Sequence, residues 1–247
     1  MNPITALWLR QVKRYYRSVP RMIGSLAQPL LFLVVFGFGF GPIFARAGAG
    51  DYKQYLVPGI IAMSVLFTSM FMGIEIIWDK QFGFLKGTLV APVSRTEIMI
   101  GRTLGGASVG VIQGLIVLLV ALVIGFEINI MAMPLAVLFM ILIALLFTAL
   151  GTAIASVLDD MHGFQLVMNF LIMPTFFLSG ALFPLENLPK VLTTITHLNP
   201  LTYGVDGLRD ALIGTGVFSI AMNLTVLFIS TAILLAVGSY MFSRIEI

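Results

Sequence analysis

Few side chains in this sequence have the type and spacing that catalysis or metal binding requires. The chain has no cysteine, and its two histidines, His162 and His197, lie in separate loops without clustered partners, so we expect no thiolate or histidine metal site. No lysine directly follows a glycine, so the phosphate-binding loop G-x-x-x-x-G-K-[ST] is absent and no nucleotide cofactor is expected in this chain. An enzyme would need a polar catalytic cluster. The nearest match, DDMHG from Asp159, is interpreted as a helix-connecting loop.

The elements that would have to position any site are membrane helices. Of the 247 residues, 59% are hydrophobic and 10% are charged, whereas about a quarter of residues in soluble domains are charged. A helix needs about 20 residues to cross a bilayer, because backbone amides cannot stay unpaired in lipid. We predict an all-α polytopic membrane protein, with Pro134 near the start of the fourth span. Its six spans fall within residues 22–45, 54–74, 103–126, 128–158, 161–185 and 211–243.

The distribution of Lys and Arg predicts the orientation. Ten of them flank the spans on the side that both termini would share, and four lie on the other side. Cytoplasmic flanks retain these residues, so we predict cytoplasmic termini in the inner (cytoplasmic) membrane. The first run could instead be a signal peptide, since residues 45–49 resemble a cleavage site, but it exceeds the roughly 7–15 apolar residues of such a segment. A net charge of +3 does not point to nucleic acid.

Residues 1–21 predict an amphipathic helix that lies in the membrane interface. Its basic face can meet anionic lipid or a cytosolic protein. Topology anchoring alone is the alternative, because the positive-inside rule already requires a basic flank. On a helical wheel the apolar face holds Ile4, Trp8, Val12, Tyr15 and Val19, and the opposite face holds Arg10, Lys13, Arg14, Arg17 and Arg21.

Residues 79–102 form a polar interlude between the second and third spans. Pro92 breaks it, and Ser94 or Thr96 is expected to cap a short helix that runs into Glu97. An interfacial helix is one reading of this segment. The other is a docking surface, because its apolar side chains need to be covered by lipid or protein; they are Phe82, Phe84, Leu85, Val93 and Ile98.

Three motifs make the sequence resemble the type-2 permeases of ATP-binding-cassette (ABC) exporters, in the drug-efflux and nodulation-type branch. They are YLVPGI at residues 55–60, LVAPVSR at 89–95 and NPLTYGVDGLR at 199–209. The likeness covers nearly the whole chain, including its length and six spans. The last motif matches the family signature at Pro200, Leu201, Tyr203 and Arg209.

The resemblance implies a single permease domain over residues 1–247 that forms a homodimer and binds two copies of a separate ABC ATPase subunit. ATP and Mg would be held by that ATPase. By the same resemblance the N-terminal helix is a connecting helix that touches the ATPase through Trp8, Arg10, Lys13, Arg14 and Arg17. The segment between the second and third helices becomes the coupling element, with Pro92, Val93, Ser94, Arg95, Thr96 and Glu97.

Residues 185–215 predict a pair of short helices that re-enter the membrane from the outer face, because each is too short to span it. The resembling family has such a hairpin. We assign its signature residues Pro200, Leu201, Tyr203 and Arg209 to shaping an outer gate, rather than to substrate contact. Asp206, Arg209 and Asp210 are expected to pair on neighbouring turns.

A glycine stripe and a few amides predict how the helices pack. Gly101, Gly105, Gly106, Gly110 and Gly114 allow close helix packing within the chain, with a subunit interface as the alternative. The amides of the spans are expected to hydrogen-bond between helices, with substrate contact as the alternative; they are Gln28, Gln113, Asn169 and Asn223. The candidate substrate path consists of Phe32, Phe36, Phe67, Phe71, Gln113 and Asn169.

The function expected from the resemblance is ATP-driven export of an amphipathic or hydrophobic substrate, such as a drug, lipid or lipid-linked glycan, by alternating access at the permease dimer interface. The rival is an ion-gradient-driven secondary carrier. A carrier would need an ionisable residue near mid-bilayer or two interrupted half-helices. The membrane-proximal acids Glu75 and Asp79 lie instead where the second span is expected to leave the membrane.

Overall fold

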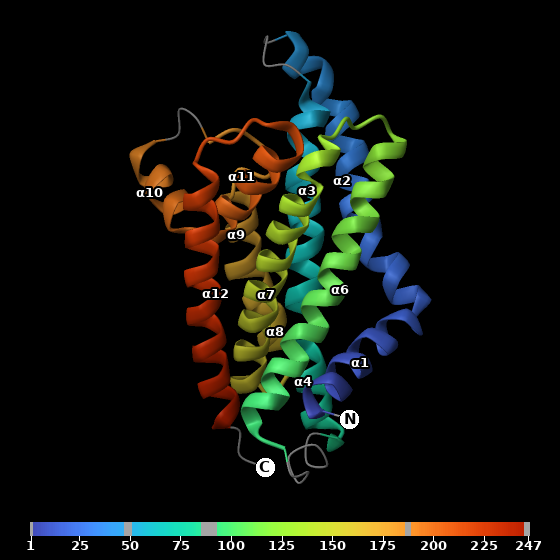
Figure 1. Cartoon of the computed structure of the whole chain (residues 1–247), viewed down its shortest axis with the longest axis vertical. Coiled ribbons are helices and arrows are strands. Elements are labelled where there is room, and N and C mark those ends of the chain that lie inside the picture. Colours follow the sequence, from blue (N-terminus) through green and yellow to red (C-terminus); the bar gives the residue numbers. More distant parts are fainter. Residues whose placement is uncertain (1, 47–50, 85–92, 186–188, 245–247) are drawn as a thin grey trace.

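The computed structural model describes residues 2–46, 51–84, 93–185 and 189–244, and in these ranges it contains helices and no strand. The predicted all-α fold is confirmed. Figure 1 shows the long helices side by side along the long axis, with both termini at one end, here called the terminus end, and α10 and α11 near the opposite, far end. The elements are α1 Pro3–Tyr16, α2 Val19–Arg46, α3 Tyr52–Phe71, α4 Ile74–Gln81, α6 Arg95–Val123, η1 Ile130–Ala132, α7 Met133–Val157, α8 Met161–Val167, the π-helical η2 Met168–Ile172, α9 Met173–Phe177, α10 Lys190–Leu198, α11 Pro200–Ile213 and α12 Ile220–Ser243.

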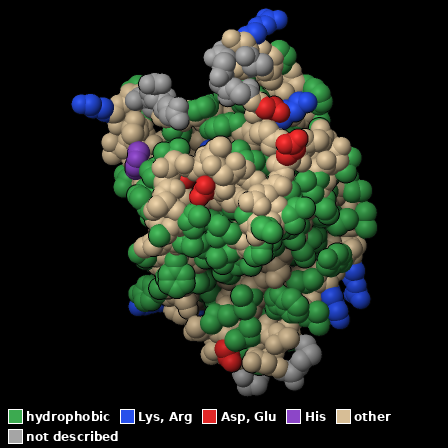
Figure 2. Space-filling view, turned by 45° about the horizontal axis from the view of Figure 1, so that its top comes forward, with side chains coloured by type: hydrophobic (Ala, Val, Ile, Leu, Met, Phe, Trp, Pro, Cys, Tyr) green, Lys and Arg blue, Asp and Glu red, His purple; other side chains and the backbone are tan. Residues whose placement is uncertain are grey.

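Five helical segments of the described chain are long and apolar enough to cross a bilayer: Met22–Phe44, Tyr52–Gln81, Arg95–Val123, Ile130–Val157 and Ile220–Ser243. Hydrophobic side chains accordingly cover much of the flank visible in Figure 2. The run predicted as the fifth span, residues 161–185, is α8, η2 and α9 in succession, which end at Phe177. At 1.5 Å per residue this path is about 26 Å long, somewhat less than a hydrocarbon core of about 30 Å.

Local features set two of the helix boundaries. The last span lies within the predicted run 211–243 and begins at Ile220, because α11 continues to Ile213 and ends at Gly214 with a φ of 69°, a left-handed conformation that glycine adopts without strain. The amphipathic helix expected over residues 1–21 ends at Tyr16, and α2 begins at Val19. Pro134 lies in the first turn of α7 as predicted.

The helix capped by Ser94 is not short. Ser94 is the N-cap of α6: its hydroxyl accepts from the Glu97 amide at 3.2 Å, and the Glu97 carboxylate accepts from the Ser94 amide at 2.9 Å. This capping box satisfies two helix-terminal amides. The helix then continues without a break to Val123, so residues 95–102, expected as part of the cytosolic interlude, belong to the same helix as the third span.

The glycine stripe of α6 packs against other helices of the same chain, as predicted. A Cβ atom at Gly105 would lie 2.6 Å from the Gln11 Cβ of α1, and one at Gly114 would lie 2.6 Å from a Val65 methyl of α3. These distances are shorter than van der Waals contact, so the glycines permit the close approach of α1 and α3 to α6.

Candidate functional site

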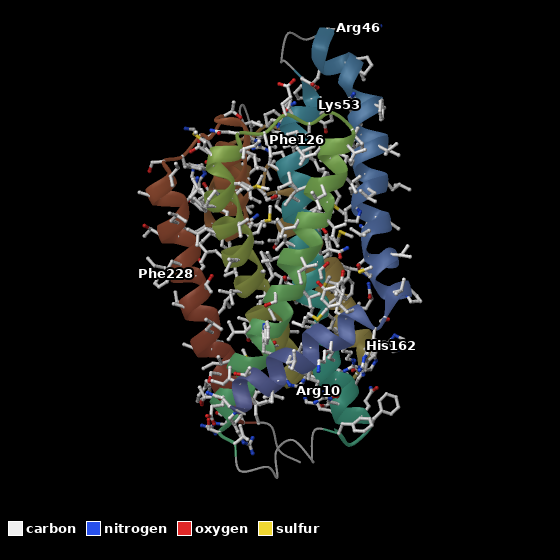
Figure 3. All side chains as sticks on the ribbon, turned by 45° about the vertical axis from the view of Figure 1, so that its right-hand side comes forward. Arg10, Arg46, Lys53, Phe126, His162 and Phe228 are labelled. Carbon is white, nitrogen blue, oxygen red and sulfur yellow. The ribbon has the colours of Figure 1, made fainter. Side chains whose placement is uncertain are left out.

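Five charged side chains from three helices meet near the terminus end of the bundle. We call this cluster the charged joint; it consists of Arg10 and Arg14 of α1, Glu75 and Asp79 of α4, and Arg102 of α6. Asp79 forms an ion pair with Arg102 and lies 3.5 Å from a nitrogen of Arg10. A carboxylate oxygen of Glu75 lies 3.5 Å from a nitrogen of Arg14. Figure 3 shows α1, with Arg10 labelled, crossing in front of the long helices at this end.

Both acids of the charged joint are buried. Glu75 is 2% exposed and Asp79 is 4% exposed, whereas the sequence analysis placed them where the second span emerges from the membrane. The two acids are four residues apart on α4, and the two arginines that meet them are four residues apart on α1. Each pair therefore lies on one face of its helix, and the two faces form two ion pairs with each other. A buried charge is strongly destabilising without its partner. The joint therefore holds α1, α4 and α6 in one relative position.

The apolar face of α1 packs against α6 rather than lying free for lipid. The Trp8 indole donates to the Ser108 hydroxyl at 2.9 Å. The Tyr15 hydroxyl donates to the Gln113 side chain, whose amide nitrogen donates to the Ser25 hydroxyl of α2 at 2.9 Å. These contacts and the charged joint tie α1 to the bundle, and its position in the membrane interface stays a prediction.

Removal of the Tyr15 hydroxyl is expected to destabilise the α1–α6 contact. In Tyr15→Phe the buried Gln113 oxygen loses its donor, which costs about 1–3 kcal/mol. We expect a decrease in the thermal unfolding temperature of about 2–4 °C per kcal/mol, measured in detergent. Tyr16→Phe is the matched control, because Tyr16 is exposed. Equal unfolding temperatures for the two variants would contradict the role assigned to this hydrogen bond.

The segment expected to couple to the ATPase lies partly on the surface of the terminus end. Pro92 is outside the described residues. Val93 packs against the hydrophobic core, and an Arg95 nitrogen donates to the Ser243 carbonyl at the end of α12, at 3.0 Å. Glu97 is engaged in the capping box. Within this segment, Ser94 and Thr96 are exposed. Lys13 and Arg17, at the end of the neighbouring helix α1, are exposed as well.

A cavity of about 380 Å³ adjoins the charged joint, with walls from α1, α2, α3, α4 and α8. Aromatic rings, aliphatic side chains, hydroxyls and one amide line it, and the described residues of its wall are uncharged. Tyr15 of α1 and Trp78 of α4 belong to the wall, and the Arg14 guanidinium lies 5.7 Å from the centre of the Trp78 ring. The cavity and the charged joint therefore share two helices.

The structure brings together only part of the predicted substrate path. Phe67 and Phe71 line the cavity. Phe32 and Phe36 instead belong to a row of rings along α2, with centroids 5.1 Å apart, and pack against the core. Gln113 is buried and bonds to Tyr15 and Ser25 of two other helices. This agrees with the prediction that amides of the spans hydrogen-bond between helices. Asn169 is exposed on η2 and accepts from the Gln165 amide at 3.3 Å.

Sequence reasoning missed two hydroxyls of the cavity wall. Ser64 and Thr68 line it beside Phe67 and Phe71. The signal was present, because these four residues of α3 are spaced by three or four positions and therefore share one helical face.

At the far end, α11 is almost wholly buried between other helices. It begins at Pro200 after the N-cap Asn199, and Leu201 is buried. Arg209 donates to the Gly180 carbonyl at 2.9 Å and lies 3.9 Å above the Tyr55 ring. Tyr203 donates to the His197 carbonyl at 2.9 Å. Burial lowers the pKa of Arg209 and raises that of Tyr203, because desolvation disfavours both charged forms.

The ion pairs expected among Asp206, Arg209 and Asp210 are replaced by other contacts. The Asp206 carboxylate accepts from the amides of Val217 and Phe218 at 2.8 and 3.0 Å, and from the Asn223 side chain at 2.9 Å. Arg209 is directed to the backbone carbonyl of Gly180, as described. Asp206 therefore fixes the loop before α12, and Arg209 fixes the turn after α9.

A bundle of apolar helices long enough to cross a bilayer defines a multi-pass membrane protein, and an uncharged cavity lies among its helices. The chain belongs to the ABC-2 type transporter family, which matches residues 2–213. The resemblance noted from the sequence motifs is confirmed by this match.

Three relatives show how far the similarity extends. The chain is 32% identical over 216 residues to the putative transport permease ycf38 of Pyropia yezoensis, covering 85% of this chain and 73% of that protein. It is 26% identical over 248 residues to nodulation protein J of Rhizobium leguminosarum bv. trifolii, covering 93% and 91%. It is 26% identical over 215 residues to the inner membrane transport permease YadH of Escherichia coli K12, covering 85% and 83%.

Proposed function

We propose that this chain is the permease subunit of an ABC exporter, which moves an amphipathic or hydrophobic substrate by alternating access and is powered by two copies of a separate ATPase subunit. The observation that carries the proposal is that the charged joint and the cavity share α1 and α4. Movement of α1 or α4 by a bound ATPase would therefore reshape the cavity wall. ATP and Mg would be held by the ATPase, and two permease copies would form the membrane unit.

In this proposal the terminus end faces the cytoplasm across the inner (cytoplasmic) membrane. The positive-inside rule supports this orientation, since the basic residues of α1 lie at this end, and Arg46 and Lys53 lie at the other end in Figure 3. The ATPase would dock on the exposed Ser94 and Thr96 and on Lys13 and Arg17, the exposed basic residues at the end of α1. The cavity would receive the apolar part of a drug, a lipid or a lipid-linked glycan, and its hydroxyl and amide groups would bind an uncharged polar part of the substrate.

An ion-gradient-driven carrier remains the runner-up. The buried carboxylates of Glu75 and Asp79 are the groups that such a carrier would use. Each of them is paired with an arginine, which favours a structural role over proton or cation exchange. Vesicles containing the chain alone distinguish the two functions, because a carrier would take up substrate along an ion gradient without any ATPase.

A charge placed at Thr96, in the segment proposed to bind the ATPase, tests the proposal directly. We expect Thr96→Glu to lower substrate-dependent ATP hydrolysis about tenfold in vesicles that contain the permease and its ATPase, because a misplaced interfacial charge costs more than a kcal/mol. Thr96 is exposed at the terminus end, so the fold should be kept. Thr194→Glu, on the exposed surface of α10, is the matched control and should leave hydrolysis unchanged. Equal activity of both variants would overturn the docking assignment.

A further inference from the structure

A second hollow of the chain, here called the hairpin groove, lies beside the turn that joins α10 to α11. Its volume is about 440 Å³, and its walls come from α7, η2, α9, α10 and α12. Of its described wall residues, Thr175 and Asn199 carry polar side chains. The Thr175 hydroxyl donates to the Leu171 carbonyl, and the Asn199 amide donates to the Thr175 carbonyl, each at 2.7 Å. The rest of this wall is apolar, so the groove suits hydrocarbon.

The hairpin groove lies at the depth of the bilayer core. Its wall residue Leu234 is 14 residues from the start and nine from the end of the span Ile220–Ser243. Leu146, also in the wall, is 16 and 11 residues from the ends of the span Ile130–Val157. At 1.5 Å per residue, both lie about 13 Å or more from either end. Acyl chains surround a membrane helix at this depth, so a lipid tail is the molecule that can reach the groove.

The groove is held open by the hydrogen bonds of its walls. The bond between Asn199 and Thr175 ties the turn to α9, and the Tyr203 hydroxyl ties α11 to the His197 carbonyl of α10 at 2.9 Å. An unfilled gap forfeits the dispersion contacts of the atoms around it. One wall is the π-helical η2, a conformation that occurs frequently at functional sites, and its Phe170 is 79% exposed. The groove is therefore open to an acyl chain from outside the bundle.

Helix α10 provides a path from the far end of the bundle to the groove. Val191, Ile195 and Leu198 are 72%, 42% and 79% exposed, and their spacing places them on one helical face. Ile195 and Leu198 line the groove. Lys190, the one charged side chain of α10, is exposed at its first residue, about 12 Å along the helix from Leu198. Figure 1 shows α10 on the outside of the bundle near the far end.

We propose that the hairpin groove binds one acyl chain of a phospholipid with an anionic head group, and that Lys190 contacts this head group. The apolar wall at bilayer depth accounts for the acyl chain. Attraction between a lysine near the membrane surface and an anionic lipid accounts for the head group. The bound lipid joins α10 to α7 and α12 and supports the hairpin from outside. Its site is separate from the cavity beside the charged joint and does not depend on the direction of transport.

Photo-cross-linking tests where the acyl chain lies. The full-length chain is placed in phosphatidylcholine vesicles with a trace of phosphatidylglycerol whose acyl chain ends in a diazirine, and the labelled peptides are identified by mass spectrometry. We expect the label to concentrate on η2, α9 and α10. Ile195→Trp fills part of the groove and should lower this labelling about tenfold, by displacing about two methylene groups of the lipid. Ile229→Trp is the matched control, because Ile229 is 52% exposed on α12 and is not a groove residue.

Competition tests the role of Lys190. In the unsubstituted chain, unlabelled phosphatidylglycerol should displace the probe about fivefold better than phosphatidylcholine, which corresponds to one lysine near the membrane surface. Lys190→Gln should remove this preference. Lys53→Gln, at the far end on α3 (Figure 3), is the matched control and should keep it. Unfolding temperatures in lipid-free detergent verify that each variant folds.

Concentrated labelling that falls in Ile195→Trp, together with a head-group preference lost in Lys190→Gln, supports the proposal. Even labelling around the membrane helices, or equal labelling of Ile195→Trp and Ile229→Trp, would show ordinary lipid contact and overturn it. Equal competition by the two phospholipids in the unsubstituted chain would overturn the assignment of the head group. Absence of label, with a covalent dimer formed by oxidised Ile195→Cys, would show that a second copy covers the groove instead of a lipid.

Discussion

Replacing Asp79 with leucine is expected to destabilise the protein by about 3–5 kcal/mol, because the substitution leaves the buried Arg102 without its counter-charge. Arg102 is almost fully buried, and two of its guanidinium nitrogens already have no hydrogen-bond partner. The ion pair with Asp79 is therefore the interaction that compensates its charge. Arg10, which also meets Asp79, is partly exposed and can turn towards water.

The expected readout is a decrease of the unfolding temperature in detergent by about 6–20 °C, at 2–4 °C per kcal/mol. Asp159→Leu is the control. Like Asp79, Asp159 forms an ion pair, in this case with Lys80 at 3.1 Å. The Asp159 side chain is 90% exposed, and exposed ion pairs contribute at most about 1 kcal/mol to stability.

A second variant separates charge from packing. In Asp79→Leu/Arg102→Met both buried charges are removed, and replacing a buried ion pair by apolar groups is often nearly neutral. We expect the double variant to recover most of the lost stability. Because the joint would then no longer connect α4 with α6, ATP hydrolysis in the complex should respond less to substrate. A double variant as unstable as Asp79→Leu would show that the ion pair is not the cause.

The second large effect is expected at Gly59, where α3 meets the turn after α9 at the far end. A Cβ atom at Gly59 would contact the carbonyl oxygen of Ala181 and would lie 2.6 Å from its carbonyl carbon. The turn cannot move away easily, because its backbone carbonyls are bound by Tyr52, Tyr55 and Arg209. Gly59→Ala should therefore cost about 3 kcal/mol or more by overpacking.

The matched control for Gly59→Ala is Gly39→Ala in α2, where an added Cβ atom meets nothing within 4 Å. Alanine favours the helical state by about 1 kcal/mol over glycine, so the control should be neutral or slightly stabilising. Thermal unfolding in detergent compares the two. A small effect at Gly59 would mean that α3 and the turn after α9 are not held as close together as described.

The sequence predicted those features that depend on residues close together in the chain. Ser94 was one of the two predicted caps, and the proline in the first turn of α7 and the close packing of the glycine stripe of α6 were also predicted. The length of α6 was not, because a proline and several charges before residue 103 read as a surface loop. In the structure Arg102 pairs with the distant Asp79 and Arg95 donates to the Ser243 carbonyl, and α6 runs without a break from Arg95 past Arg102.

The sequence by itself determined the class of the protein, because a chain with 59% hydrophobic and 10% charged residues that has charge-free runs of about 20 residues or more satisfies its backbone in a bilayer as helices. Its motifs determined the family. Only the tertiary structure decided which charges and amides act together. Asp79 meets Arg10, which lies 69 positions earlier in the chain, and the cavity draws on five helices. Such pairings depend on how helices pack, which helical periodicity does not specify, so they had to be observed in the fold.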